Sequence, residues 1–175
     1  IPTYRVCELA RKRVTVCLSG DGGDEIFAGY RRHKWHMLEE KIRSFVPRGV
    51  RGPLFKVLGD YYPKMDWAPK FMRAKSTFQA LQREALCAYL HTMSFVPDHR
   101  REKLFSDDFK RELGGYHALE VFKRHANDFD GDDALSLIQF LDMKTYLPGD
   151  ILTKVDRASM AHSLEVRVPI IDHEF

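Results

Sequence analysis

The stretch that decides the fold is Val14-Thr15-Val16-Cys17-Leu18-Ser19-Gly20-Asp21-Gly22-Gly23-Asp24-Glu25. Residues 14–18 form a short, β-branched, apolar run, which predicts a strand buried on both faces of a parallel sheet. A glycine-rich loop follows over 19–23, and apolar residues at helical spacing then predict a long helix from Asp24 to Phe45. Open α/β sheets bind ligands where a strand passes into a helix, so the loop is a candidate ligand site.

The loop has the composition of a turn that approaches a ligand closely. Gly20, Gly22 and Gly23 allow tight turning of the backbone, and free N–H groups at the helix start favour an anion such as phosphate. It is not a Walker A loop, because no Gly-Lys-Ser/Thr follows. It is not a dinucleotide fingerprint either, because Glu25 stands where the third glycine belongs.

Three carboxylates in and after the loop, Asp21, Asp24 and Glu25, would repel a bare phosphate. Their presence is consistent with Mg2+ lying between carboxylate and phosphate oxygens. An acidic residue here could also act as a general base. The alternative is a turn whose acids only cap the helix and complement its dipole, and the residues alone leave both interpretations open.

A second constellation runs from Leu147 to Pro169, where charges are sparse among apolar residues. We expect these charges to form a partly buried polar network, because buried charges need partners. The partners are either one another or a ligand. The expected members are Lys154, Asp156, Arg157, Glu165 and Arg167.

The rest of the chain is predicted to be mostly helical. Helices are expected over 4–12 with Thr3 as cap, over 50–58, over 116–126 and over 133–146, and Pro47 should end the helix begun at Asp24. Ser106 should cap another helix that Gly114-Gly115 stops. We expect a loop from Tyr61 to Pro69, a break and then a short helix after Leu147-Pro148-Gly149, and extended backbone over Glu165–Pro169. One further long helix is marked by Phe71, Ala74, Phe78, Leu81, Ala85, Tyr89 and Met93.

Three weaker signals are not interpreted as sites. Residues 128–133 resemble a calcium loop, but the sixth position is Asp133 and the twelfth is Gln139, which predicts a turn at a helix start instead. His33 and His36 share a helix face without an acidic ligand at matching spacing, so a metal site is not expected. The aromatic residues Phe71, Phe78 and Tyr89 are interpreted as core.

Composition limits the classes of protein. The 175 residues are 44% apolar and 30% charged with a mean hydropathy of −0.39, which is typical of one soluble globular domain. The longest uncharged run, Ala85 to Pro97, is too short and too polar to span a bilayer. Three widely spaced cysteines, Cys7, Cys17 and Cys87, argue against a disulfide framework and favour the cytoplasm.

The net charge of +3 is unevenly distributed. Residues 1–56 hold 12 Lys/Arg against 6 Asp/Glu, whereas residues 57–175 hold 16 against 19. A basic first third would suit an anionic ligand such as a nucleotide, although on charge alone a solvated basic helix surface is the favoured interpretation. The sequence contains no long run of basic residues with interleaved aromatics that would argue for nucleic acid.

Taken together, the two constellations resemble a known family. Residues 18–25, followed by Phe27-Ala28-Gly29-Tyr30, resemble a motif of the glutamine-dependent asparagine synthetases. Residues 154–157, 159–165 and 167–169, with Asp172, resemble the second block of that family's synthetase domain, in the same order and at a similar separation. The resemblance implies an α/β parent fold of the ATP-pyrophosphatase type (adenine-nucleotide alpha-hydrolase-like), within which residues 1–175 form the C-terminal part of the synthetase domain.

The resemblance also implies a reaction and its cofactors. Such enzymes use ATP and Mg2+ to convert a carboxylate, most often that of aspartate, to an acyl-adenylate, which ammonia from glutamine then attacks. The matched positions imply ATP binding by Ser19, Gly20, Asp21 and Gly22, a Mg2+ ligand at Asp24, and catalytic roles for Asp21, Glu25, Lys154 and Arg157. A glutaminase domain of the parent chain is the implied partner, with a homo-oligomer as a further possibility and no membrane or nucleic acid.

The chain departs from the family pattern in several places. It contains no glutaminase domain, no Ser-Gly-Gly-x-Asp-Ser pyrophosphate loop and no distal catalytic lysine, so we expect residues 1–175 to be inactive alone. Asp21 replaces the more familiar glutamate, and the form of both blocks resembles homologues from polysaccharide and secondary-metabolite clusters. Two alternatives therefore stay open: a homologue that amidates or cyclises another carboxylate, and a non-catalytic helical interaction module.

Overall fold

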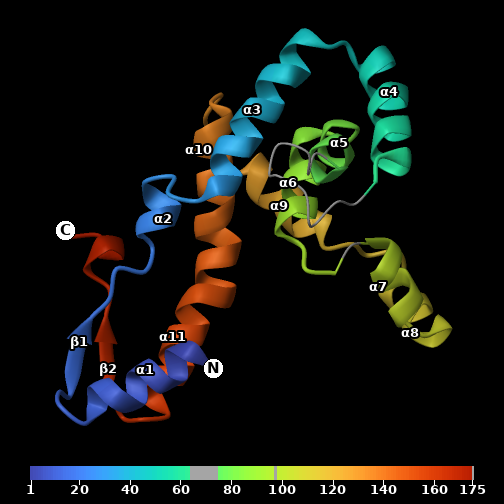
Figure 1. Cartoon of the computed structure of the whole chain (residues 1–175). Coiled ribbons are helices and arrows are strands. Elements are labelled where there is room, and N and C mark those ends of the chain that lie inside the picture. Colours follow the sequence, from blue (N-terminus) through green and yellow to red (C-terminus); the bar gives the residue numbers. More distant parts are fainter. Residues whose placement is uncertain (64–74, 97, 175) are drawn as a thin grey trace. The chain divides into compact units, whose positions relative to one another are not determined.

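The computed structural model describes residues 1–63, 75–96 and 98–174 (Figure 1). The chain divides into two compact units. The first comprises Ile1–His33 and Gly131–Phe175, and the second comprises Lys34–Asp130. The expected residues Phe71 and Ala74, and 64–69 of the expected loop, lie outside the described residues.

A short parallel sheet lies in the first unit. Strand β1 (Val16–Leu18) pairs with β2 (Glu165–Arg167), with Cys17 opposite Val166. The parallel strand is confirmed, although β1 is shorter than residues 14–18, and the expected extended backbone is confirmed over Glu165–Arg167, whereas Pro169 begins a short 3-10 helix. The expectation that this strand is buried on both faces is wrong, because Val16 is 40% exposed and Leu18 is 73% exposed. Only β2 pairs with β1 in the part of the chain that the structure describes, so nothing there shields the strand's outer side chains.

Helices cover one side of this strand pair. Helix α1 (Pro2–Arg11) packs against α11 (Thr153–Met160), which in turn packs against β2 (Figure 1). The prediction that Thr3 caps the first helix is wrong. The helix begins with Pro2 at its first position, where a residue without an N–H group loses no hydrogen bond. The core of this unit consists of Cys7, Ile138, Leu141, Leu147, Ile151, Val155 and Leu164.

Three helical segments follow one another without a loop in the first unit. They are α10 (Ala134–Leu141), the π-helix η2 (Asp142–Leu152) and α11. Asp133 caps α10 by accepting a hydrogen bond from the Ser136 N–H at 2.7 Å, so the predicted helix start is confirmed. The expected break at Leu147-Pro148-Gly149 is wrong. The wider turns of a π-helix give the Pro148 ring room that an α-helix lacks.

The predicted long helix from Asp24 to Phe45 is also wrong, because it is two helices. They are α2 (Gly23–Ile26) and α3 (Arg31–Phe45), and α3 continues into the second unit. The turn between them places Ala28 at φ 55°, in the left-handed region, and the Gly29 N–H donates to the Asp24 carbonyl at 2.9 Å. This six-to-one bond is the helix stop of a Schellman motif.

The second unit consists of helices. After α3 come α4 (Arg48–Tyr61), α5 (Lys75–Leu81), α6 (Ala85–Met93), α7 (Asp98–Leu104), α8 (Asp107–Leu113) and α9 (Leu119–Asn127). The expected long helix ending at Met93 is interrupted at 82–84, because the chain turns there and α5 packs against α6. The cap at Ser106, the stop at Gly114 and the core position of Tyr89 are confirmed. Among the described helices, none combines the length and apolarity needed to cross a membrane.

Candidate functional site

The glycine-rich loop lies at the carboxyl edge of the parallel strand pair. Because β1 and β2 run in the same direction, the loop 19–23 and the short helix η3 (Pro169–Ile171) emerge at the same end (Figure 1). The Ser19 N–H extends the pairing by donating to the Arg167 carbonyl at 2.8 Å. This edge is where open α/β sheets bind ligands, so the loop has the expected location.

Close packing requires a glycine at one position of the loop, Gly22. Gly22 has φ +88°, and a Cβ there would lie 2.3 Å from Ile171 Cγ2. A Cβ on Gly23 would lie 3.5 Å from Ile170 Cδ1, an ordinary contact. Gly20 differs, because a Cβ there would meet no atom within 4 Å. The loop therefore rests on η3 at Gly22 and faces open space at Gly20.

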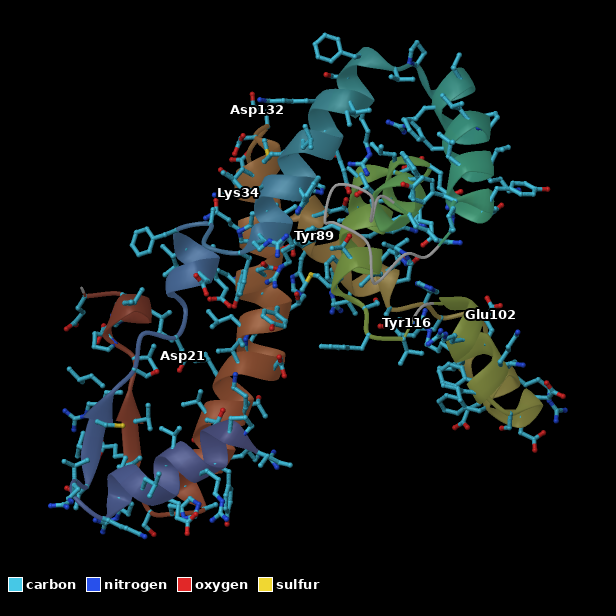
Figure 2. The ribbon with its side chains drawn as sticks, viewed as in Figure 1. Asp21, Lys34, Tyr89, Glu102, Tyr116 and Asp132 are labelled. Carbon is cyan, nitrogen blue, oxygen red and sulfur yellow. The ribbon has the colours of Figure 1, made fainter. Side chains whose placement is uncertain are left out.

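The three carboxylates have three different environments. Asp21 is half-buried on the loop (Figure 2) and accepts a hydrogen bond from the Ser19 hydroxyl. Asp24 is exposed, and its carboxylate lies so close to Gly29 that a Cβ there would be 1.9 Å from Asp24 Oδ1. Glu25 is 1% exposed and accepts a hydrogen bond from Tyr30 Oη at 2.6 Å. Asp21 and Asp24 are thus accessible to a ligand, whereas the buried Glu25 stabilises the turn after α2 through its hydrogen bond with Tyr30.

The loop offers a small oxygen donor set to a cation. In the described ranges, no group of three or more His, Cys, Asp or Glu side chains is arranged to hold a metal. Mg2+ at nucleotide sites usually takes one or two protein carboxylates and completes its shell with phosphates and water. The exposed carboxylate of Asp24 on α2, with Asp21 on the preceding loop, fits that donor set.

The charges of the second block are not a buried network. Lys154, Asp156 and Arg157 are exposed on α11, and the Glu165–Arg167 ion pair of 2.7 Å is exposed on β2. The prediction of partial burial is wrong, because α11 buries Val155 and Ser159 and leaves its charged residues on the opposite side. Within the described ranges, no hydrogen bond or ion pair joins Lys154 or Arg157 to the loop.

The buried polar cluster of this unit instead centres on Asp142, which the sequence analysis did not single out. Asp142 is fully buried, and its Oδ2 accepts a hydrogen bond from Arg32 Nη2 at 2.7 Å and lies 2.9 Å from His33 Nε2. The available signal is that Asp142 is the sole acid between Ala134 and Leu147, a largely apolar helical run. A lone carboxylate in such a run requires a buried cationic partner.

Two tyrosines extend this cluster toward the loop. The Arg32 guanidinium lies 3.7 Å from the ring centroid of Tyr30 and 4.6 Å from that of Tyr146. Burial and the adjacent Glu25 carboxylate raise the pKa of Tyr30, and burial raises the pKa of Tyr146. Both phenols are therefore neutral donors, and Tyr30 links the Asp142 cluster to Glu25.

The two histidines of the helix face have separate protein partners. His33 contacts Asp142 in the first unit, and the buried His36 ring lies 5.3 Å from the Tyr89 ring in the second. The second unit also contains a small pocket lined by Arg83, Cys87, Leu90, His91, Ser94, His117 and Leu119. None of the expected site residues lines that pocket.

The described residues define a mostly helical protein with a two-stranded parallel sheet, whose glycine-rich loop with accessible carboxylates lies at the carboxyl edge of the strand pair. More particularly, the chain belongs to the asparagine synthase family, whose sequence model matches residues 1–175. The predicted family is confirmed.

Relatives with this similarity come from bacteria and an archaeon. The chain is 32% identical to "Asparagine synthetase [glutamine-hydrolyzing] 1" of Bacillus subtilis (strain 168), over 98% of this chain and 25% of the relative. It is 33% identical to a putative asparagine synthetase of Mycobacterium bovis, over 99% of this chain and 25% of the relative. It is 31% identical to a putative asparagine synthetase of Methanocaldococcus jannaschii, over 91% of this chain and 28% of the relative. The chain thus spans about a quarter of the length of these relatives. No solved structure matches it significantly.

Proposed function

We propose that this chain forms part of an ATP-dependent ligase that amidates a carboxylate, with conversion of aspartate to asparagine as the reaction. The single observation that carries this is the loop 19–23 at the carboxyl edge of the β1–β2 pair, in a chain of the asparagine synthase family. The relatives' names, which specify asparagine synthesis with glutamine hydrolysis, support glutamine as the ammonia source. In this proposal the strand pair belongs to a larger ATP-pyrophosphatase-type sheet, and a glutaminase domain is its partner.

The proposed reaction has two steps. A carboxylate oxygen of the acceptor bonds to the α-phosphorus of ATP, and pyrophosphate leaves with the electrons of the broken P–O bond. The nitrogen of ammonia then bonds to the acyl carbon, AMP leaves, and the nitrogen loses a proton. The first step requires a site that holds ATP firmly and stabilises the charge on the leaving pyrophosphate, and the second requires the acyl-adenylate to stay bound until ammonia attacks.

The loop residues are assigned to ATP. Ser19, Gly20 and Gly22 would bind the nucleotide through backbone groups, since the space over Gly20 is open. The hydroxyl of Ser19 holds the carboxylate of Asp21, which would serve the reacting centre. Asp24 would contribute to a Mg2+ shell, and Mg2+, when bound, would neutralise phosphate charge.

The remaining assignments depend on position in the second block. Lys154 and Arg157 are exposed cations that would be free to bind an anionic group of a substrate. Glu25, buried and bonded to Tyr30, would act by holding the loop and its neighbour Asp24. These roles stay proposals, as does the identity of the acceptor carboxylate.

The test is exchange of labelled pyrophosphate into ATP by the full-length protein, with aspartate present and without ammonia. Aspartate-dependent exchange would support the proposal, and Asp24→Asn should depress it strongly because the variant removes the metal-facing charge. Wild-type exchange in that variant would refute the role of Asp24. Absence of Mg2+-dependent ATP binding, measured by calorimetry, would favour the helical interaction module instead.

A further inference from the structure

Helix α2 consists of four residues, Gly23–Ile26, and therefore cannot be stable by itself. Its last carbonyl groups have no partner within the helix, as at any helix end. Gln139 on α10 satisfies two of them. Its Nε2 donates to the carbonyl of Ile26 at 2.6 Å and to the carbonyl of Glu25 at 3.1 Å. One amide group thus uses both of its hydrogens on the end of α2.

The other hydrogen bonds described for α2 join it to the turn that follows it, and α2 also packs against η2. Tyr30 Oη donates to the Glu25 carboxylate, and the Gly29 N–H donates to the Asp24 carbonyl. Both contacts are between residues close in sequence, so they shape α2 but do not attach it to another helix. Among these hydrogen bonds, only those from Gln139 connect α2 to a helix more than a hundred residues away in the chain.

We propose that Gln139 is a positioning residue that fixes the direction of α2, and with it Asp24 and the preceding loop, for binding of Mg2+ and ATP. Gln139 does not touch the ligand site itself. Its effect on α2 stands on the geometry, whereas its effect on nucleotide binding rests on the proposed function. A misplaced α2 would turn the Asp24 carboxylate away while leaving the rest of the fold in place.

Two variants of the full-length protein separate this role from general packing. Gln139→Glu keeps the shape of the side chain but replaces the amide donor with an acceptor, which opposes the two carbonyls. Gln139→Met removes the amide donor without adding a charge. It replaces Gln139→Glu in the experiment if that variant fails to fold. Ser136→Ala, at an exposed position of the same helix, is the matched control.

The first measurement is amide hydrogen exchange of residues 21–30 without nucleotide. We expect exchange there to accelerate about tenfold or more in both Gln139 variants, since loss of one buried hydrogen bond corresponds to roughly that factor. Exchange over α1 and α11 should stay unchanged, and in the control exchange over residues 21–30 should stay unchanged. Unchanged exchange over 21–30 in both variants would overturn the proposal.

The second measurement is kinetic. We expect KM for ATP to rise about tenfold, with KM for ammonia unchanged and with partial recovery at high Mg2+, since only the metal and nucleotide site is misplaced. An equal rise in KM for ATP and KM for ammonia, without recovery at high Mg2+, would overturn the positioning role, because it would indicate general damage. If the wild-type protein does not bind ATP, the proposed function fails, whereas the exchange measurement still decides whether Gln139 holds α2.

Discussion

Substitution of Gly29 by alanine would test whether the direction of the Asp24 carboxylate matters. The added Cβ would lie 1.9 Å from Asp24 Oδ1, 2.9 Å from its Cγ and 3.2 Å from its Cα. Carbon and oxygen atoms that are not bonded pack at about 3.5 Å, so the carboxylate must move by more than about 1 Å. The nearby Cα of Asp24 is backbone and cannot yield as a flexible side chain does.

Gly29→Ala should have a small effect on stability and a large effect on activity. Overpacking costs about 1–3 kcal/mol, and the lower end applies here because Asp24 is exposed and its side chain can rotate into solvent. At about 1 kcal/mol, the midpoint of thermal unfolding should fall by only about 2–4 °C for a chain of this size. A displacement of about 1 Å at a site of reaction can cost about 100-fold in rate. We therefore expect kcat/KM for ATP to fall about 100-fold while the protein remains folded.

The assay is pyrophosphate exchange by the full-length protein at varied ATP concentration, together with a thermal melt of the same preparation. Gly52→Ala is the control, because a Cβ there meets nothing within 4 Å and Gly52 lies inside α4. That control should keep its activity and gain about 0.5–1 kcal/mol in stability from helix propensity. Wild-type kcat/KM in Gly29→Ala would refute the importance of the carboxylate's direction. A loss of more than about 10 °C in its melting midpoint would refute the claim that the displacement is local.

Three further predictions concern other residues. Asp21→Ala should lower kcat more than it raises KM for ATP, the pattern of an interaction made mainly in the transition state, and an unchanged kcat would make Asp21 a structural residue. Burial raises the pKa of Glu39 from 4.5 to about 7 despite Arg43 nearby, so its contribution to stability is complete below pH 4.5 and is lost as pH rises through 7. Glu39→Gln should therefore stabilise the protein by up to roughly 3 kcal/mol at pH 8 and hardly at pH 4, and equal melting shifts at both pH values would contradict this. Arg32→Ala leaves the buried Asp142 without its guanidinium partner, so the free energy of unfolding measured by urea denaturation should fall by about 3–5 kcal/mol. Arg32→Lys should recover part of that stability. An unchanged free energy of unfolding in Arg32→Ala would show that the ion pair contributes nothing.

The features that the sequence predicted well are those set by local chemistry. The β-branched run before three glycines identified the strand and loop, and Ser106 and Asp133 identified helix starts because their oxygens accept hydrogen bonds from nearby N–H groups. The parallel orientation of β1 followed from the same local pattern. These features depend on residues within a few positions of one another.

The features that the sequence analysis missed depend on distant or unusual partners. The turn after α2 was not predicted because Ala28, not a glycine, adopts the left-handed conformation, which costs about 1–2 kcal/mol. The pairing of Arg32 with Asp142 joins residues 110 positions apart, and no local pattern reveals it. The exposure of Leu18 depends on which neighbours cover the strand, which its own apolar character cannot indicate.

The register of the two strands has a consequence for the order of folding during synthesis. Val16 pairs with Glu165, so nearly the whole described chain is made between the two strands. At translation rates of about 5–20 residues per second, β2 is synthesised roughly 10–30 seconds after β1. The Gly22 loop likewise waits for Ile171, against which it packs. Helices such as α8, whose contacts are local, can form in that interval, whereas the ligand edge is completed among the last parts of this segment. Mutations that slow strand pairing would therefore lower the yield of a competent site before they lower the stability of the finished protein.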